Sequence, residues 1–125
     1  TQAAPVLDSI PAERRIDLVG AADLPVLAAT LQKCALFVGN DSGLMHLAAA
    51  SGTPTLGLFG PSPEYRYAPW GAHTAVARTR ESYQDLVGAP GFDHRTTGTL
   101  MDGLDVDTAV AAAETLWRRM QGEAA

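Results

Sequence analysis

The chain has 125 residues, of which 46% are hydrophobic, so it can form one compact core but hardly two domains. Nine lysine and arginine residues against fourteen aspartate and glutamate residues give a formal charge of -5, which argues against binding a nucleic-acid backbone. The single cysteine, Cys34, excludes an internal disulfide and fits a reducing cytoplasm. No His/Cys cluster has the spacing of a zinc site, and no apolar run approaches the ~20 residues that a membrane span requires.

The N-terminal part of the chain predicts a strand followed by a helix, after a first segment whose structure the sequence leaves open. Within residues 1–15, apolar side chains fit the last turn of a helix that Pro11 would end. Residues 15–20 form a short apolar run stopped by a glycine, which predicts a strand. In residues 21–35, leucines recur at helical spacing, Asp23 stands where an N-cap belongs, and a proline occupies the first turn, where its missing N–H costs nothing.

The central part predicts two buried strands around a short helix. Residues 35–39 are continuously apolar, which is typical of a parallel strand buried on both faces. Residues 43–51 follow as a helix that Gly52 ends, and one face of it carries Leu44, Leu47 and Ala48. Residues 54–60 then supply another buried strand.

The C-terminal part continues this alternation. Residues 61–71 have the composition of a loop, and residues 73–78 that of a strand. No period dominates from Thr79 to Gly103, so this long segment is expected to be a functional loop or to hold a local helix. Residues 105–121 predict a capped helix with an apolar stripe of Val106, Val110, Ala113, Trp117 and Met120. Strands that alternate with helices imply a parallel sheet, so the predicted class is α/β.

Residues 40–46, Asn-Asp-Ser-Gly-Leu-Met-His, are the strongest candidate for chemistry, and two interpretations compete. One is a serine hydrolase with Ser42 as the nucleophile. A nucleophile elbow needs Gly-x-Ser-x-Gly, but Asn40 and Leu44 stand at the glycine positions. His46 would lie about one helical turn above Ser42 instead of opposite its hydroxyl, and no motif surrounds the other histidines, His73 and His94. The hydrolase interpretation therefore ranks second.

The other interpretation is a phosphate-binding turn. The segment follows the carboxyl end of a predicted buried strand and opens a helix, and Gly43 leaves the backbone uncovered. The amides of Ser42, Gly43 and Leu44 would then point outward together, where the helix dipole adds positive potential. Gly60 and Pro61 open a second glycine-rich loop after the next strand, and both loops would rim one cleft.

Asp41 complicates this interpretation, because its negative charge would repel a phosphate placed beside it. The carboxylate either caps the helix or accepts hydrogen bonds from a hydroxyl-rich group such as a sugar. A purely structural alternative also stays open, in which Asp41 and Ser42 only cap the helix and His46 is an ordinary helix residue.

A longer stretch around these residues resembles a known family. Residues 37–61, FVGNDSGLMHLAAASGTPTLGLFGP, followed by YAPWG at 67–71, are similar to the C-terminal nucleotide-sugar domain of glycosyltransferase family nine, the bacterial heptosyltransferases of lipopolysaccharide core synthesis. The similarity is close from about Ile16 to Gly71, and residues 101–116 resemble the family's closing helix. A strand, an Asp-Ser/Thr-Gly-x-x-His turn, an alanine-rich helix, Gly-x-Pro and Phe-Gly-Pro follow in this order.

This resemblance implies most of the C-terminal domain of a two-domain GT-B glycosyltransferase, with a Rossmann-like parallel sheet flanked by helices. Residues 1–125 would be a single nucleotide-sugar-binding domain, and a fragment that lacks the N-terminal acceptor domain and the first strands of its own domain. The implied reaction is an inverting transfer of a sugar from a nucleoside diphosphate, typically ADP-heptose, to a lipid-linked saccharide, with no cofactor and no metal. The implied location is cytoplasmic and peripheral at the inner membrane.

By position in the family's motif, the amides of Ser42, Gly43 and Leu44 would hold the diphosphate. Asp41 would meet the donor sugar, and His46 would support the same pocket. The family's general base lies outside this segment, so no residue here is expected to be catalytic and the isolated chain is expected to be inactive. Uncovered sheet surface would also favour self-association. The alternative from a different class is a non-catalytic module of the same fold that binds a nucleotide, a phosphate or a protein partner.

Packing or solvation is the expected role of several other residues. The aromatic side chains expected to anchor their loop by packing are Tyr65, Tyr67 and Trp70. Trp117 is expected in the core, and Cys34 as a small buried hydrophobe at a helix end. Three arginines are expected to be solvated, with contact to a phosphate as the alternative, namely Arg66, Arg78 and Arg80.

Overall fold

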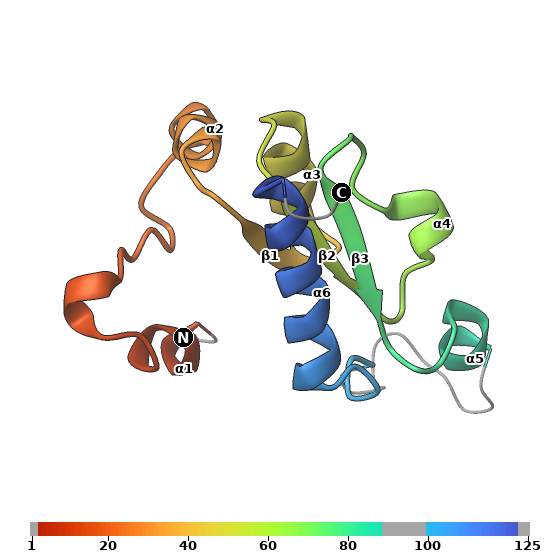
Figure 1. The fold of residues 1–125 in the computed structure, drawn as a ribbon. Coiled ribbons are helices and arrows are strands. Elements are labelled where there is room, and N and C mark those ends of the chain that lie inside the picture. Colours follow the sequence, from red (N-terminus) through yellow and green to blue (C-terminus); the bar gives the residue numbers. More distant parts are fainter. Residues whose placement is uncertain (1–2, 89–99, 123–125) are drawn as a thin grey trace.

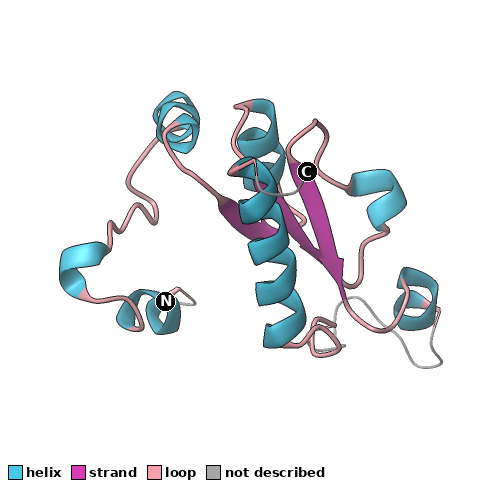
Figure 2. Cartoon of the chain, in the orientation of Figure 1, coloured by secondary structure: helices cyan, strands magenta, loops and turns pink. Residues whose placement is uncertain are grey.

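The structure of the chain, a computed structural model, describes residues 3–88 and 100–122. Its centre is a sheet of three parallel strands in the order β1-β2-β3 (Figure 1). The strands are β1 (Phe37–Asn40), β2 (Thr55–Phe59) and β3 (Thr74–Arg78). Helices connect and flank these strands (Figure 2), so the predicted α/β class with a parallel sheet is confirmed.

Two helices cover opposite faces of this sheet. A side chain added at Gly57 of β2 would meet a methionine sulfur of α3 (Gly43–Ala50) at 2.7 Å. On the other helix, α6 (Val106–Met120), Leu116 packs with Leu56 of β2. Because neighbouring residues of a strand point to opposite faces, the two contacts place α3 and α6 on opposite sides. The sheet is thus the middle layer of an α/β/α arrangement.

β1 lies at the edge of the sheet and is not buried on both faces, so this part of the prediction is wrong. Val38 is 47% exposed. It pairs in register with Leu56 and therefore faces the same side as α6, but that helix packs against β2 and β3. A strand is buried on both faces only where both faces are covered. β2, in the centre, is buried as predicted.

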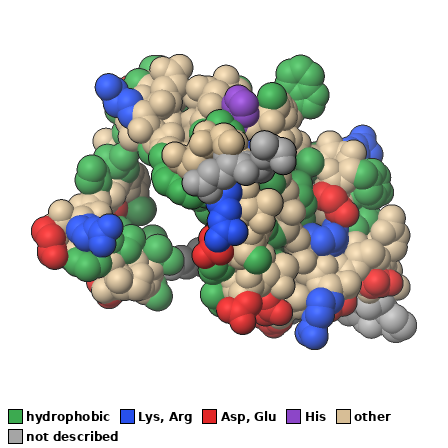
Figure 3. Space-filling model, viewed as in Figure 1, with side chains coloured by type: hydrophobic (Ala, Val, Ile, Leu, Met, Phe, Trp, Pro, Cys, Tyr) green, Lys and Arg blue, Asp and Glu red, His purple; other side chains and the backbone are tan. Residues whose placement is uncertain are grey.

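The N-terminal segment extends away from the sheet in Figure 1. It contains α1 (Ala4–Asp8), the 3-10 helix η1 (Ala12–Arg14) and α2 (Leu24–Gln32). The strand predicted over residues 15–20 is wrong: these residues form no strand, and Ile16 is 84% exposed. A strand needs a neighbour for its backbone groups, and none of the described strands pairs with this segment. Figure 3 accordingly shows hydrophobic side chains gathered on its surface.

Helix caps are the local features that the sequence predicts best. The Asp23 carboxylate accepts a hydrogen bond from the Val26 amide at the start of α2, as predicted, at 3.1 Å. The Asp105 carboxylate accepts one from the Thr108 amide at the start of α6, at 2.7 Å. Hydrogen bonding from the side chain and then the amide of Thr108 lowers the pKa of Asp105 below its ordinary value of 3.8.

The apolar stripe predicted for α6 is confirmed at Ala113 and Met120 and is wrong at its other three positions. Leu116 is 1% exposed and is joined at the core by Ala112, Ala113 and Met120. Three members of the predicted stripe are instead 75%, 47% and 42% exposed, namely Val106, Val110 and Trp117. Alanines at neighbouring positions let the helix approach the sheet closely, whereas a tryptophan at the contact would hold it away. The prediction that Trp117 belongs to the core is therefore wrong.

The apolar face predicted for α3 is confirmed at Ala48 and wrong at Leu44. Met45 and Ala48 are buried, while Leu44 is 45% exposed. The helix ends as predicted, because Gly52 follows it with a φ of 83°, a conformation that glycine adopts without strain. The exposure of Leu44 leaves the first turn of α3 open to solvent.

Two short helices occur between the strands and the last helix, one in a predicted loop and one where a local helix was an open alternative. α4 (Glu64–Tyr67) lies in the predicted loop of residues 61–71. α5 (Tyr83–Val87) lies in the segment from Thr79 to Gly103 and begins with a capping box of Ser82 and Asp85. The hydrogen bond from the Ser82 amide, followed by that with its hydroxyl, lowers the pKa of Asp85. Residues 89–99 lie outside the described part of that segment.

No helix among the described residues is long and apolar enough to cross a membrane.

Candidate functional site

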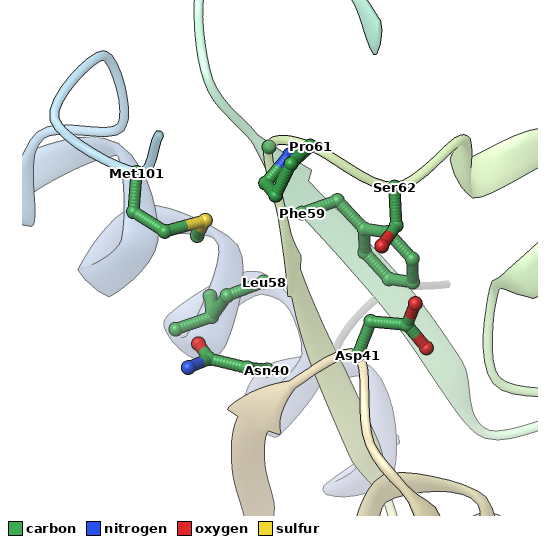
Figure 4. A pocket seen from close by; sticks show the side chains of 8 residues that line it. Asn40, Asp41, Leu58, Phe59, Pro61, Ser62 and Met101 are labelled. Atoms are coloured by element: carbon green, nitrogen blue, oxygen red, sulfur yellow. The ribbon is translucent and has the colours of Figure 1, made fainter. Parts of the chain in front are cut away.

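The carboxyl ends of β1 and β2 open into a pocket of about 140 Å³ (Figure 4). Asn40 and Leu58 pair in register, so the loops that follow them are neighbours. The lining residues are Asn40, Asp41, Leu58, Phe59, Gly60, Pro61, Ser62 and Met101. The two loops thus line one pocket, and of the predicted site residues it brings together Asp41, Gly60 and Pro61.

The Asp41 carboxylate, 24% exposed, is the one charged group among the described residues that line this pocket. Figure 4 shows it on the same side as the Ser62 hydroxyl, next to the ring of Phe59, with Asn40 and Met101 on the other side. Carboxylate oxygens accept hydrogen bonds, and hydroxyl and amide groups both donate and accept them. The pocket therefore suits a neutral, hydroxyl-rich group better than a phosphate.

The first turn of α3 begins beside the pocket without lining it. Ser42 is the N-cap, and its Oγ accepts a hydrogen bond from the Met45 amide at 3.4 Å. The first amides of a helix have no acceptor within the helix, and those of Gly43 and Leu44 precede the one that Ser42 satisfies. The helix dipole adds positive potential at these amides. The charge distribution of this turn suits an anion better than a cation, and its residues lie outside the pocket lining.

Gly43 and Gly60 differ in what requires a glycine. A side chain added at Gly43 would meet nothing within 4 Å, and its φ is not positive. A side chain added at Gly60 would lie 2.7 Å from the carbonyl oxygen of Leu100 and 2.8 Å from the sulfur of Met101. Packing thus explains the glycine at position 60, whereas neither packing nor backbone conformation explains the one at position 43.

Asp41 and His46 are brought together across the first turn of α3. The Nε2 atom of His46 lies 3.7 Å from Oδ1 of Asp41, and the His46 side chain is 46% exposed. The carboxylate therefore faces the imidazole, while the capping role falls to Ser42.

This arrangement does not favour the serine hydrolase interpretation. The Ser42 hydroxyl oxygen accepts a hydrogen bond from the Met45 amide, and the His46 imidazole lies next to the Asp41 carboxylate instead of the Ser42 hydroxyl. A nucleophile and its base need to lie within hydrogen-bond reach of each other. The other two histidines add no support, because His73 is exposed before β3 and His94 lies outside the described residues.

Arg78 was expected to be solvated, and this expectation is wrong. It is the last residue of β3, its side chain is 20% exposed, and its guanidinium forms an ion pair with Glu64. It also donates a hydrogen bond to the carbonyl oxygen of Gly60 at 2.8 Å. The signal in the sequence is a charged residue at the carboxyl end of an apolar strand, where parallel neighbours end as well.

Met101 is another lining residue that the sequence did not single out, because the segment from Thr79 to Gly103 has no periodic pattern.

Cys34 is exposed after the end of α2, so its predicted burial is wrong. The aromatic residues predicted to pack are also exposed, to 74%, 43% and 89% for Tyr65, Tyr67 and Trp70. Within residues 3–88 and 100–122, no three His, Cys, Asp or Glu side chains are arranged to hold a metal ion.

Comparison with protein families gives a match over most of the chain. The model described as glycosyltransferase family 9 (heptosyltransferase) matches residues 2–89. This range contains β1, α3, β2 and both loops that line the pocket. No solved structure matches the chain.

Curated relatives share partial similarity with the chain. Lipooligosaccharide heptosyltransferase 2 of Haemophilus influenzae is 39% identical over 48% of this chain and 18% of its own length. Lipopolysaccharide heptosyltransferase 2 of Escherichia coli K12 is 44% identical over 56% of this chain and 20% of its own length. Lipopolysaccharide heptosyltransferase 3 of Escherichia coli is 40% identical over 42% of this chain and 16% of its own length. The matched part of the chain thus spans no more than about a fifth of these relatives.

Proposed function

The chain belongs to glycosyltransferase family 9 (heptosyltransferase), and on this basis we propose that it is the donor-binding part of a bacterial glycosyltransferase that acts in lipopolysaccharide or related glycan synthesis. The observation that carries the proposal is the combination at the ends of β1 and β2. An open helix N-terminus lies next to a pocket in which Asp41 is the one charged residue among the described lining residues. These two features match the two halves of a sugar diphosphate.

The diphosphate is assigned to the first turn of α3. The amides of Ser42, Gly43 and Leu44 donate to its oxygens, in a position where the helix dipole favours negative charge. The open space beside Gly43 supports this assignment, because a phosphate needs close access to the backbone there. Hydrogen bonds to a charged group are each worth about 1.5–3 kcal/mol, so two or three of them give useful affinity.

The sugar is assigned to the pocket. Asp41 accepts hydrogen bonds from its hydroxyl groups, His46 orients the carboxylate, and the loop that begins at Gly60 and Pro61 forms the opposite wall. Pockets for drug-sized ligands are usually about 300–1,000 Å³. A pocket of about 140 Å³ is smaller than this range, so we assign only the sugar to it and place the nucleoside outside.

The donor is ADP-heptose in this proposal, and the acceptor is a lipid-linked saccharide held by another part of a longer protein. The transfer inverts the anomeric centre, and the general base belongs to that other part. No described residue is assigned a catalytic role, so the chain by itself binds donor without turnover. The site requires no cofactor, and the working location is the cytoplasmic side of the inner membrane.

An amide NMR titration of the chain with ADP, UDP and inorganic phosphate tests the proposal. Saturable shifts concentrated at residues 42–46, stronger for one diphosphate than for phosphate and lost in Gly43→Val, are the expected result. A folded chain that shows no shift there at millimolar ligand refutes donor binding by this chain. Such a result favours the alternative of an interaction module with the same fold.

A further inference from the structure

The Arg78 guanidinium binds three acceptors, two in the stretch after β2 that includes a pocket wall and one in the segment after β3. Its Nη1 pairs with the carboxylate of Glu64, and its Nη2 donates to the carbonyl oxygen of Gly60 at 2.8 Å. Nε and Nη2 both donate to the carbonyl oxygen of Glu81, at 3.3 and 3.0 Å. A planar guanidinium presents donors in fixed directions, so a single side chain fixes all three acceptors relative to one another.

Two of these contacts stand at the two ends of one pocket wall. Pro61 and Ser62 line the pocket, Gly60 precedes them, and Glu64 begins the helix that follows. The guanidinium of Arg78 thus holds the loop where it leaves β2 and again where it enters α4. The short turn between these points has both ends anchored to the same group.

The end of β3 is linked to the Met101 side of the pocket as well. The Arg80 amide donates to the carbonyl oxygen of Gly103 at 3.1 Å. Gly60 leaves room for the Met101 sulfur, which a side chain at Gly60 would meet at 2.8 Å. Residues at the end of β3 and just after it therefore contact segments on two sides of the pocket, the loop of Gly60 through Arg78 and the segment of Gly103 through Arg80.

We propose that Arg78 and Glu64 are positioning residues that fix the wall of Pro61 and Ser62 for the bound sugar diphosphate. This inference rests on the proposed function for the identity of the ligand. The two side chains are 20% and 35% exposed, and the core around Leu56 lies elsewhere. Partly exposed ion pairs contribute little to global stability, so the main effect of this pair is on the geometry of the loop.

The test compares the 125-residue chain with Arg78→Gln, Arg78→Lys and Glu64→Gln. The control is Arg119→Gln, because Arg119 donates a similar hydrogen bond to the carbonyl oxygen of Thr74, at the other end of the same strand, at 3.0 Å. Backbone ¹⁵N order parameters of Gly60 and Ser62 are measured without ligand, and ADP and ADP-heptose affinities are measured by calorimetry.

In Arg78→Gln, the order parameters of Gly60 and Ser62 are expected to fall from about 0.85 toward 0.6. ADP-heptose affinity is expected to fall about tenfold, with a smaller effect on ADP, which lacks the sugar. Arg78→Lys keeps the charge but cannot span both acceptors, so it should restore only part of either quantity. Arg119→Gln should change neither quantity.

Two results overturn the inference: unchanged order parameters in Arg78→Gln, or a mobile loop that binds ADP-heptose with the original affinity. A general loss of stability would lower the melting temperature and leave the affinity of the folded molecules unchanged, which also counts against a positioning role. If the unsubstituted chain binds neither nucleotide, the proposed function fails. The order parameters then still decide whether Arg78 holds the loop.

Discussion

Replacing Gly43 by alanine separates ligand binding from folding. The added methyl group would meet nothing within 4 Å, and the backbone at Gly43 is not left-handed. A glycine-to-alanine change at such a position stabilises a protein by about 0.4–1 kcal/mol, because it restricts the unfolded chain. For a domain of this size, the melting temperature should stay the same or rise by about 2–4 °C.

Binding should change in the opposite direction. The methyl group of Gly43→Ala occupies the space through which a phosphate oxygen approaches the amides of Gly43 and Leu44. Losing one hydrogen bond to a charged group costs about 1.5–3 kcal/mol. Because 1.4 kcal/mol corresponds to a factor of ten, the dissociation constant for ADP should rise about 10- to 100-fold.

Gly60→Ala is the matched control, since Gly60 is the other glycine of the proposed site. Its methyl group would lie 2.7 Å from the backbone oxygen of Leu100, so it should destabilise the fold by about 1–3 kcal/mol. Thermal melts and calorimetric ADP titrations measure both variants. If Gly43→Ala keeps its affinity for ADP, the assignment of the diphosphate to this turn is refuted. If Gly43→Ala loses much stability, the open space beside Gly43 is refuted.

Three further predictions concern the pocket, the helix caps and the core. Asp41→Asn should weaken ADP-heptose by about tenfold and leave ADP unchanged or bound slightly better, as calorimetry would show; equal losses for both contradict a sugar contact. The pKa values of Asp85 and Asp105 are lowered in the folded state, so their stabilisation is present above pH 3.8 and is lost as the pH falls through the folded pKa. Urea midpoints should drop over this acid range, and Asp105→Asn should reduce the drop. Leu116→Ala should lower the free energy of unfolding by about 2–5 kcal/mol and Trp117→Ala by about 1 kcal/mol or less, as measured by urea unfolding. The reverse order would mean that Trp117 faces the core, as the sequence predicted.

Features set by neighbouring residues were predictable from the sequence. The caps at Asp23 and Asp105 depend on one side chain and an amide three residues later. The meeting of Asp41 with Gly60 and Pro61 follows from parallel topology, because the carboxyl ends of adjacent parallel strands lie side by side. Short-range chemistry and the class of sheet therefore predict these features without a structure.

Features set by distant contacts were not predictable. Residues 15–20 have the composition of a strand, but a strand also needs a neighbour, which composition does not reveal. In α6 the small alanine side chains do not define the inward face, and packing against the sheet selects the rotation that turns Leu116 inward. Arg78 contacts Gly60 and Glu64, which lie far from it in the chain, so only the fold brings them together.

A crystal structure of the chain with ADP-heptose bound tests the central claim most directly. The proposal predicts diphosphate oxygens at about 2.7–3.2 Å from the amide nitrogens of Gly43 and Leu44, with the heptose in the pocket beside Asp41. A diphosphate bound away from the first turn of α3, or a sugar that does not enter the pocket, would contradict it.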